Sequence, residues 1–310
     1  MSETGFRHEA MLYSTRAEFL DGTTAFIRDG VERDEPVLVV VDADKIAALR
    51  AGLDGRADRV HFTDMATVGQ NPARIIPAWH DFVDAHRGEG RRMRGVGEPI
   101  WAGRTPTELV ECRQHEALLN LAFGEVDGFT LLCPYDTAHL DPTIIEQAHG
   151  THPTVRHDHG DGPCAPSEHY RGVRTAELLA EPLDPPPADA ATFAFGPALR
   201  PVRHFASAFA ADTGFGTKSA DVALVVGELA TNSLRHGGGH GTLLIWQGDG
   251  ALICEVRDRG RITDPMLGRR RPLLRQFGGR GLWLINQLCD LVQIRSTAAG
   301  SAIRVHLRLA

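Results

Sequence analysis

The segment of this chain with the most evident chemical potential is a polar series, Glu228-Leu-Ala-Thr-Asn232-Ser-Leu-Arg-His236. Glu228, Asn232 and His236 recur every four residues, so on a helix they project from one face. The amide oxygen of an asparagine is a hard ligand for Mg²⁺, whose remaining ligands are usually water and phosphate. A carboxylate beside it can accept a proton from water or a hydroxyl. The pattern indicates a magnesium–phosphate site; the alternative is a solvated polar stripe.

Two glycine-containing segments follow this series. Val256-Arg-Asp258-Arg-Gly260 places a carboxylate at the end of an expected strand, where it can accept a hydrogen bond from an exocyclic amine such as that of adenine. Gly278-Gly279-Arg280-Gly281-Leu282 opens an expected helix, whose backbone amides and dipole attract an anion. Taken singly, the first segment is also a common turn and the second a plain loop before a helix.

The second half of the chain must position these residues. Its pattern predicts helices at Leu199–Ala211, Ser219–His236 and Leu282–Val292, strands at Thr242–Gln247 and Leu252–Asp258 around the turn Gly248-Asp249-Gly250, and a closing hairpin of Gln293–Ser296 and Ala302–Leu309. Helices beside an antiparallel sheet indicate an α+β sandwich.

The first half alternates strands and helices instead. Strands are expected at Val37–Val41, Val60–Phe62, Gly95–Trp101 and Phe129–Cys133, and helices at Asp44–Leu53, Arg74–His86, Thr105–Phe123 and Pro142–Ala148. This alternation predicts an α/β domain with a mainly parallel sheet.

A proline- and glycine-rich segment separates the two halves. Its prolines exclude a continuous helix or a central strand, although a short helix is expected at Thr175–Ala180. We expect a first domain at 1–156, a linker at 157–190 and a second domain at 191–310.

Composition and net charge argue against several classes of function. The chain has 310 residues, of which 42% are hydrophobic, and its net charge of -7 argues against a general nucleic-acid or anionic-membrane binder. No apolar run approaches the roughly 20 residues of a membrane span, and the first residues lack an apolar signal core, so we expect a cytoplasmic protein. The five cysteines form no CxxC pair and no disulfide framework.

Together, the three polar segments resemble the Bergerat-fold (GHKL) ATPases, the superfamily of gyrase, histidine kinases and the MutL repair protein. The motifs ELATNSLRH, VRDRG and GGRGLWLI are most similar to those of the RsbW-like anti-sigma factor serine kinases. This resemblance extends from about Thr192 to Ala310. One position departs from the family pattern Asp-x-Gly-x-Gly, because Ile262 stands where the second glycine is usual.

The resemblance implies a role for each matching residue. It implies that Asp258 binds adenine, that Asn232 coordinates the magnesium of Mg-ATP, and that Glu228 is the catalytic base. The other nucleotide-binding positions that it implies are Arg235, His236, Gly260, Gly279, Arg280, Gly281 and Leu282. The arginines of the following loop, Arg269, Arg270, Arg271 and Arg275, either reach phosphates or an acidic partner, or form a solvated basic loop.

The first half resembles the MEDS domain, a sensory module related to RecA/KaiC-like α/β folds. The similar elements are GEPIWAGR, HEALLNLAF and LLCPYD, within about Phe6 to Val155, and this half has no GxxxxGK[ST] phosphate loop. Candidate sensor residues for a small molecule are Cys112, His115, Glu116, Cys133 and Tyr135; the alternative is that they are ordinary core and helix-surface residues. A further group, His149, His152, His157, His159 and Cys164, is either a zinc-type site or a flexible histidine-rich segment.

These likenesses imply an anti-sigma regulatory kinase. It would bind ATP and Mg²⁺, sequester a sigma factor and phosphorylate a serine or threonine of a STAS-type anti-anti-sigma antagonist, under the control of the sensory half; homodimerisation stays open. One alternative is a sensor histidine kinase, which requires an acceptor histidine on a helical hairpin before the ATPase half. Another is an anti-sigma module that holds nucleotide without transferring phosphate.

Overall fold

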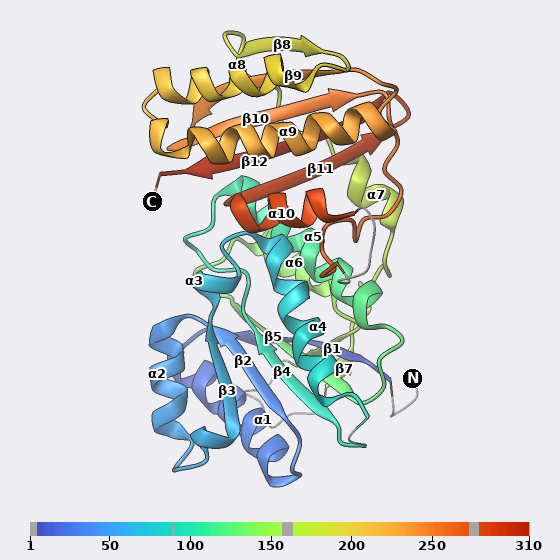
Figure 1. Cartoon of the computed structure of the whole chain (residues 1–310). Coiled ribbons are helices and arrows are strands. Elements are labelled where there is room, and N and C mark those ends of the chain that lie inside the picture. The colour runs from blue at the N-terminus through green and yellow to red at the C-terminus, as the bar shows by residue number, and fades with distance from the viewer. Residues whose placement is uncertain (1–4, 89, 157–163, 273–278, 310) are drawn as a thin grey trace. The chain divides into compact units, whose positions relative to one another are not determined.

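The computed structural model describes residues 5–88, 90–156, 164–272 and 279–309. The chain divides into two compact units, residues 1–173 and 174–310, each built around its own β-sheet (Figure 1).

The first unit contains a seven-stranded sheet in the order β3-β2-β4-β5-β1-β6-β7. Its strands are β1 (Arg7–Tyr13), β2 (Val37–Val41), β3 (Val60–Asp64), β4 (Met93–Gly97), β5 (Phe129–Asp136), β6 (Thr154–Arg156) and β7 (Ala165–Pro166). All neighbouring strands are parallel except β6 and β7, which confirms the expected α/β domain with a mainly parallel sheet.

Helices cover both faces of this sheet. They are α1 (Arg16–Glu32), α2 (Ala43–Gly52), α3 (Met65–Val68), α4 (Ile75–His86), α5 (Pro106–Phe123) and α6 (Pro142–Thr151). Apolar residues of α1 and α2 share one core with β2, including Phe19, Leu49 and Val39. On the other face, the indole of Trp79 in α4 packs so closely on β4 that side-chain atoms at Gly95 would collide with it.

Two differences from the expected elements have clear physical causes. Strand β4 is Met93–Gly97 rather than Gly95–Trp101, because Pro99 has no N–H to donate to a neighbouring strand. Strand β1 and helix α1 were not expected at all. The polar residues His8 and Glu9 are both buried within β1 and interrupt the continuous apolar run that marks a buried parallel strand.

The second unit is a sandwich of helices on a five-stranded sheet, as expected. The sheet is entirely antiparallel, in the order β11-β12-β10-β9-β8. Its strands are β8 (Ala191–Phe195), β9 (Gly241–Gly248), β10 (Ala251–Asp258), β11 (Leu291–Thr297) and β12 (Gly300–Arg308). Helices α8 (Leu199–Asp212), α9 (Ser219–His236) and α10 (Arg280–Leu288) cover one face of it (Figure 1).

Helix α9 is the element that carries the polar series. Its apolar residues Val225, Val226 and Leu229 are buried in the core with strand residues such as Leu243 and Ile245. The helix has the expected bounds, Ser219–His236, and this burial leaves Asn232 half-buried and His236 exposed. Leu224, which precedes Val225, is exposed rather than packed on the sheet.

Helix α10 is shorter than the expected Leu282–Val292. It ends at Leu288, and Leu291 and Val292 belong to β11, where they pair with His306 and Val305. The apolar residues at this junction fit a helix face and a buried strand equally well, and the pairing with β12 decides the outcome.

Short elements occupy parts of segment 157–190. Strand β7 pairs with β6 in the first unit, and the expected short helix, α7 (Thr175–Ala180), buries Leu179 in the second unit. The guanidinium of Arg304 in β12 donates to the carbonyl of Asp184 at 2.6 Å. Of the described parts of this segment, β7 therefore belongs to the first unit, and α7 and Asp184 belong to the second.

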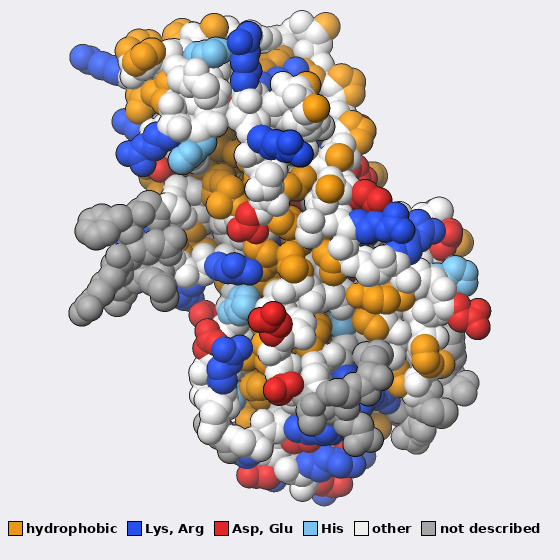
Figure 2. Space-filling model, turned by 90° about the vertical axis from the view of Figure 1, so that its right-hand side faces the viewer, with side chains coloured by type: hydrophobic (Ala, Val, Ile, Leu, Met, Phe, Trp, Pro, Cys, Tyr) orange, Lys and Arg blue, Asp and Glu red, His pale blue; other side chains and the backbone are white. Residues whose placement is uncertain are grey.

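The surface carries a mixture of charges. On the face shown in Figure 2, basic side chains are interspersed with acidic and hydrophobic ones, as expected from 33 basic and 40 acidic residues. Among the described helices, none combines the length and apolar character that a membrane crossing requires.

Candidate functional site

A cavity of about 340 Å³ lies between α9, the ends of β10 and β12, and the start of α10. Its lining includes seven of the expected site residues: Asn232, His236, Asp258, Gly260, Gly279, Gly281 and Leu282. Three segments that are separate in the sequence are thus brought to one hollow. Cavities of this size hold small-molecule ligands and cofactors.

The carboxylate of Asp258 is held by three donors at the end of β10. Its Oδ1 accepts from the Gly260 N–H at 2.8 Å and from the Ser301 hydroxyl at 2.6 Å, and its Oδ2 accepts from the Ser233 hydroxyl at 2.6 Å. A carboxylate has about four lone-pair sites, so this arrangement leaves one for a ligand donor. Asp258 is therefore a fixed, negatively charged acceptor on the cavity wall.

Glu228 and Asn232 converge on Gly281, which follows the first residue of α10. A Cβ at Gly281 would lie 2.7 Å from Glu228 Oε2 and 3.6 Å from Asn232 Nδ2. A larger residue at this position would force the Glu228 carboxylate to move. Glu228 stands beside the cavity rather than in its lining, whereas Asn232 lines it.

The turn before α10 has the geometry of an anion-binding helix start. Gly279 is the N-cap residue and has a left-handed backbone, with φ 76°, which glycine adopts without strain. Leu282 is buried and anchors the first helical turn, while Arg280 is exposed at its beginning. Gly279, Gly281 and Leu282 line the cavity, so the start of α10 lies where a phosphate-binding segment is expected.

Besides Glu228, two expected site residues lie outside the cavity lining. Arg235 and Arg280 are both exposed, and neither lines the cavity. Of the expected loop arginines, Arg269 is buried and Arg270 is exposed, while Arg271 lies over the ring of Trp283 at 5.6 Å. Arg275 falls outside the described residues.

The loop after β10 compensates in part for the missing second glycine. The backbone N–H of Ile262 donates to the Ser296 hydroxyl at 2.8 Å, and the Ile262 side chain packs at the edge of the core. The residue thus closes one wall of the cavity, which Ile262 itself lines.

Two family models match the chain. Residues 196–307 match the family described as histidine kinase-like ATPase domain, and residues 7–153 match MEDS, described as the methanogen/methylotroph, DcmR sensory domain. The chain carries a MEDS domain followed by a histidine kinase-like ATPase domain. No curated protein matches the chain.

The residues around the cavity fit ATP and magnesium, which an ATPase domain of this kind implies. Asp258 offers a charged acceptor to an amine, the turn at Gly279 offers amides to phosphate, and Asn232 offers an amide oxygen to Mg²⁺. When bound, the ion would neutralise negative charge on the phosphates.

Two contributors to this site were missed in the sequence. Ser233 and Ser301 hold Asp258 from positions 25 residues before it and 43 residues after it. Serine is common on surfaces and at turns, so neither position carries a distinctive signal. Only the pairing of β10 with β12, which sets Asp258 opposite Ser301, reveals the second contact.

The five candidate sensor residues of the MEDS domain, Tyr135 included, are all buried, and the other four separate into two groups. Cys112 and His115 are buried in α5, where the thiol of Cys112 donates to the Pro99 carbonyl at 3.4 Å. Glu116 and Cys133 instead face each other across the domain interior, together with His152 from the expected histidine group. His149 stacks edge-on with His169, and His157 and His159 lie outside the described residues.

A second polar cluster, which was not expected, lies at the carboxyl edge of the parallel sheet. Glu98, just after β4, accepts from the Tyr13 hydroxyl and from Lys45 Nζ, both at 2.6 Å. Burial raises the pKa of Glu98 despite the charge of Lys45, and burial beside Glu98 raises the pKa of Tyr13. Ligands of open α/β sheets bind at this edge, so these residues join the sensor candidates.

Proposed function

We propose that the chain is an anti-sigma regulatory kinase. In this proposal the ATPase domain binds Mg-ATP, sequesters a sigma factor, and phosphorylates a serine or threonine of a STAS-type anti-anti-sigma antagonist. The MEDS domain would bias this switch in response to a small molecule. The observation that carries the proposal is that Asn232, Asp258 and Gly279 line one cavity, while Glu228 lies beside it next to Gly281.

Each residue would have a separate task. The charged acceptor at Asp258 would select the amine of adenine, and Asn232 would hold the ion. Glu228, beside Gly281, would accept the proton of the attacking hydroxyl. The remaining catalytic effect would come from positioning and from donors aimed at the phosphates.

The proposal is tested by separating binding from transfer. We expect Glu228→Gln in the full chain to keep ATP affinity and to slow phosphate transfer by about 100- to 10,000-fold, because only the proton acceptor is lost. Asn232→Ala should weaken Mg-ATP binding itself. Glu177→Gln is the same chemical change at an exposed residue of α7, and it should alter neither ATP affinity nor the rate of phosphate transfer.

The measurement is calorimetric ATP titration beside radiolabelled transfer to purified STAS-type antagonists of the native organism. If Glu228→Gln transfers phosphate at the wild-type rate, Glu228 is not the base. If the wild type binds ATP and a sigma factor but transfers nothing, a second candidate takes its place: a nucleotide-holding anti-sigma module. The substitution of glycine by Ile262 in the loop after β10 favours that candidate.

The sensor histidine kinase alternative has less support. The dipeptide His115-Glu116 resembles a phosphoacceptor sequence, but His115 is buried within α5, and α5 is followed by β5 rather than by a second helix. A buried imidazole cannot reach the phosphate of a bound nucleotide. Acid-labile phosphohistidine after incubation with ATP would revive this alternative.

A further inference from the structure

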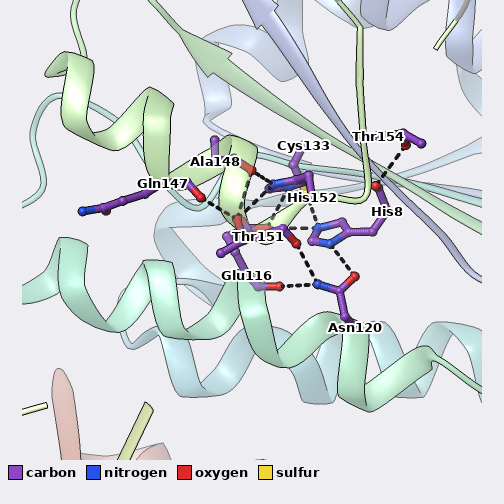
Figure 3. Close-up of polar contacts among 9 residues, drawn as sticks. All are labelled: His8, Glu116, Asn120, Cys133, Gln147, Ala148, Thr151, His152 and Thr154. Carbon is purple, nitrogen blue, oxygen red and sulfur yellow. Dashed lines mark hydrogen bonds and ion pairs between the residues drawn. The ribbon is translucent and has the colours of Figure 1, made fainter. Parts of the chain in front are cut away.

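Four buried side chains meet in the interior of the MEDS domain. They are His8 near the start of β1, Glu116 in α5, Cys133 in β5 and His152 just after α6, and one nitrogen, oxygen or sulfur atom of each lies within 4.8 Å of the others (Figure 3). Glu116 Oε2 is 3.1 Å from His8 Nε2 and 3.3 Å from His152 Nε2, and Cys133 Sγ is 3.4 Å from His8 Nε2. Imidazole, carboxylate and thiolate are ligands that transition metals prefer.

A surrounding set of acceptors fixes which nitrogen of each imidazole carries a proton. His152 Nδ1 lies 2.9 Å from the Ala148 carbonyl, which only accepts, so Nδ1 must donate. Asn120 Nδ2 donates to the Thr151 carbonyl at 2.8 Å, which turns Asn120 Oδ1 toward His8 Nδ1 at 3.2 Å. Both imidazoles therefore protonate Nδ1 and present the Nε2 lone pair to the cluster (Figure 3).

The cluster then has more acceptors than donors. Two Nε2 lone pairs and the Glu116 carboxylate face one another, and among these four side chains only the thiol of Cys133 can supply a proton in the neutral imidazole state. Glu116 Oε1 is also buried and has no hydrogen-bond partner among the described residues. Such an excess of buried acceptors is costly unless a cation lies between them.

The spacing of the ligand atoms fits a single ion. With zinc bonds of about 2.0–2.3 Å, a tetrahedral site places nitrogen and oxygen ligands about 3.4 Å apart, and nitrogen and sulfur about 3.6 Å apart. Three of the six separations, at 3.1, 3.3 and 3.4 Å, lie close to these values, and all four ligand atoms lie within 4.8 Å of one another. Hydrogen bonds from the outer nitrogens of ligating histidines to carbonyl and amide oxygens are the usual support of such sites.

We propose that His8, Glu116, Cys133 and His152 bind one divalent transition metal ion, with Zn²⁺ as the best match to the ligands. All four positions are filled by the protein, so the site is of the closed, structural kind rather than an open catalytic one. On binding, the thiol of Cys133 releases its proton to solvent and the thiolate bonds to the ion. The ion would join β1, α5, β5 and the end of α6.

The test uses the full chain freed of metal by chelation. We expect one Zn²⁺ per chain by elemental analysis after reloading, and with Co²⁺ the visible bands of a tetrahedral site plus a thiolate-to-cobalt charge-transfer band. Cys133→Ser should abolish that band. Cys112→Ser is the matched control, because Cys112 is equally buried one turn from Glu116 on α5 but outside the cluster.

Two further variants separate this site from its alternatives. Asn120→Ala removes the acceptor at His8 Nδ1 and should weaken zinc binding by about 10- to 100-fold without removing a ligand. A chain with both His157→Ala and His159→Ala should bind zinc as the wild type does. The proposal is overturned if the wild type takes up no zinc, if Cys133→Ser retains the charge-transfer band, or if binding is lost in the double histidine variant alone.

Discussion

Replacement of Asp258 by asparagine tests the nucleotide site most directly. The amide can keep its oxygen toward Gly260 N–H and Ser301, and its NH₂ group then faces Ser233. The Ser233 hydroxyl can accept from this group and donate to the Leu229 carbonyl, which lies 3.3 Å away. We therefore expect the fold to tolerate Asp258→Asn.

ATP binding, in contrast, should be weakened by Asp258→Asn. The lone pair left for a ligand amine is replaced by a second donor, so a hydrogen bond to a charged group is lost. Such bonds contribute about 1.5–3 kcal/mol, which corresponds to about 10- to 150-fold weaker ATP binding. Serine and backbone contacts at the other carboxylate oxygen stay in place, so thermal unfolding should change little.

The assay is calorimetric titration of ATP into the wild type and two variants. Asp249→Asn is the matched control, because Asp249 occupies an exposed turn between β9 and β10 with a left-handed backbone, φ 50°, that asparagine also adopts. It should bind ATP as the wild type does. If Asp258→Asn binds ATP within twofold of the wild type while remaining folded, the carboxylate does not recognise adenine and the site assignment is wrong.

Two further outcomes follow from burial. A fragment of residues 174–310 should bind ATP and should unfold at a higher temperature than a fragment of residues 185–310. The shorter fragment loses Leu179, whose burial contributes about 1.5–3 kcal/mol to stability. Equal unfolding temperatures would contradict this. Burial raises the pKa of the Cys254 thiol to about 12, so in native protein at pH 8 iodoacetamide should modify half-buried Cys164 first, and mass spectrometry showing the reverse order would contradict this.

The predicted parts of the ATPase site share one property: they are local in sequence. Glu228 and Asn232 occupy one helix face because of their spacing alone, and the expected bounds of α9 are those observed. The residues around Asp258 and Gly279 are recognisable for the same reason. Within each segment, the spacing of residues along the chain relates the side chains to one another without reference to distant parts of the protein.

What only the tertiary structure decided depends on contacts between distant segments. Ser301 reaches Asp258 through the register of β10 with β12, and Leu291 became a strand residue rather than a helical one through the same sheet. His8 and Glu116 are 108 positions apart, and no periodicity relates them. A buried polar residue such as His8 makes its strand hard to recognise in the sequence. Burying such a residue costs free energy unless it has a hydrogen-bond partner, and that partner comes from a distant segment.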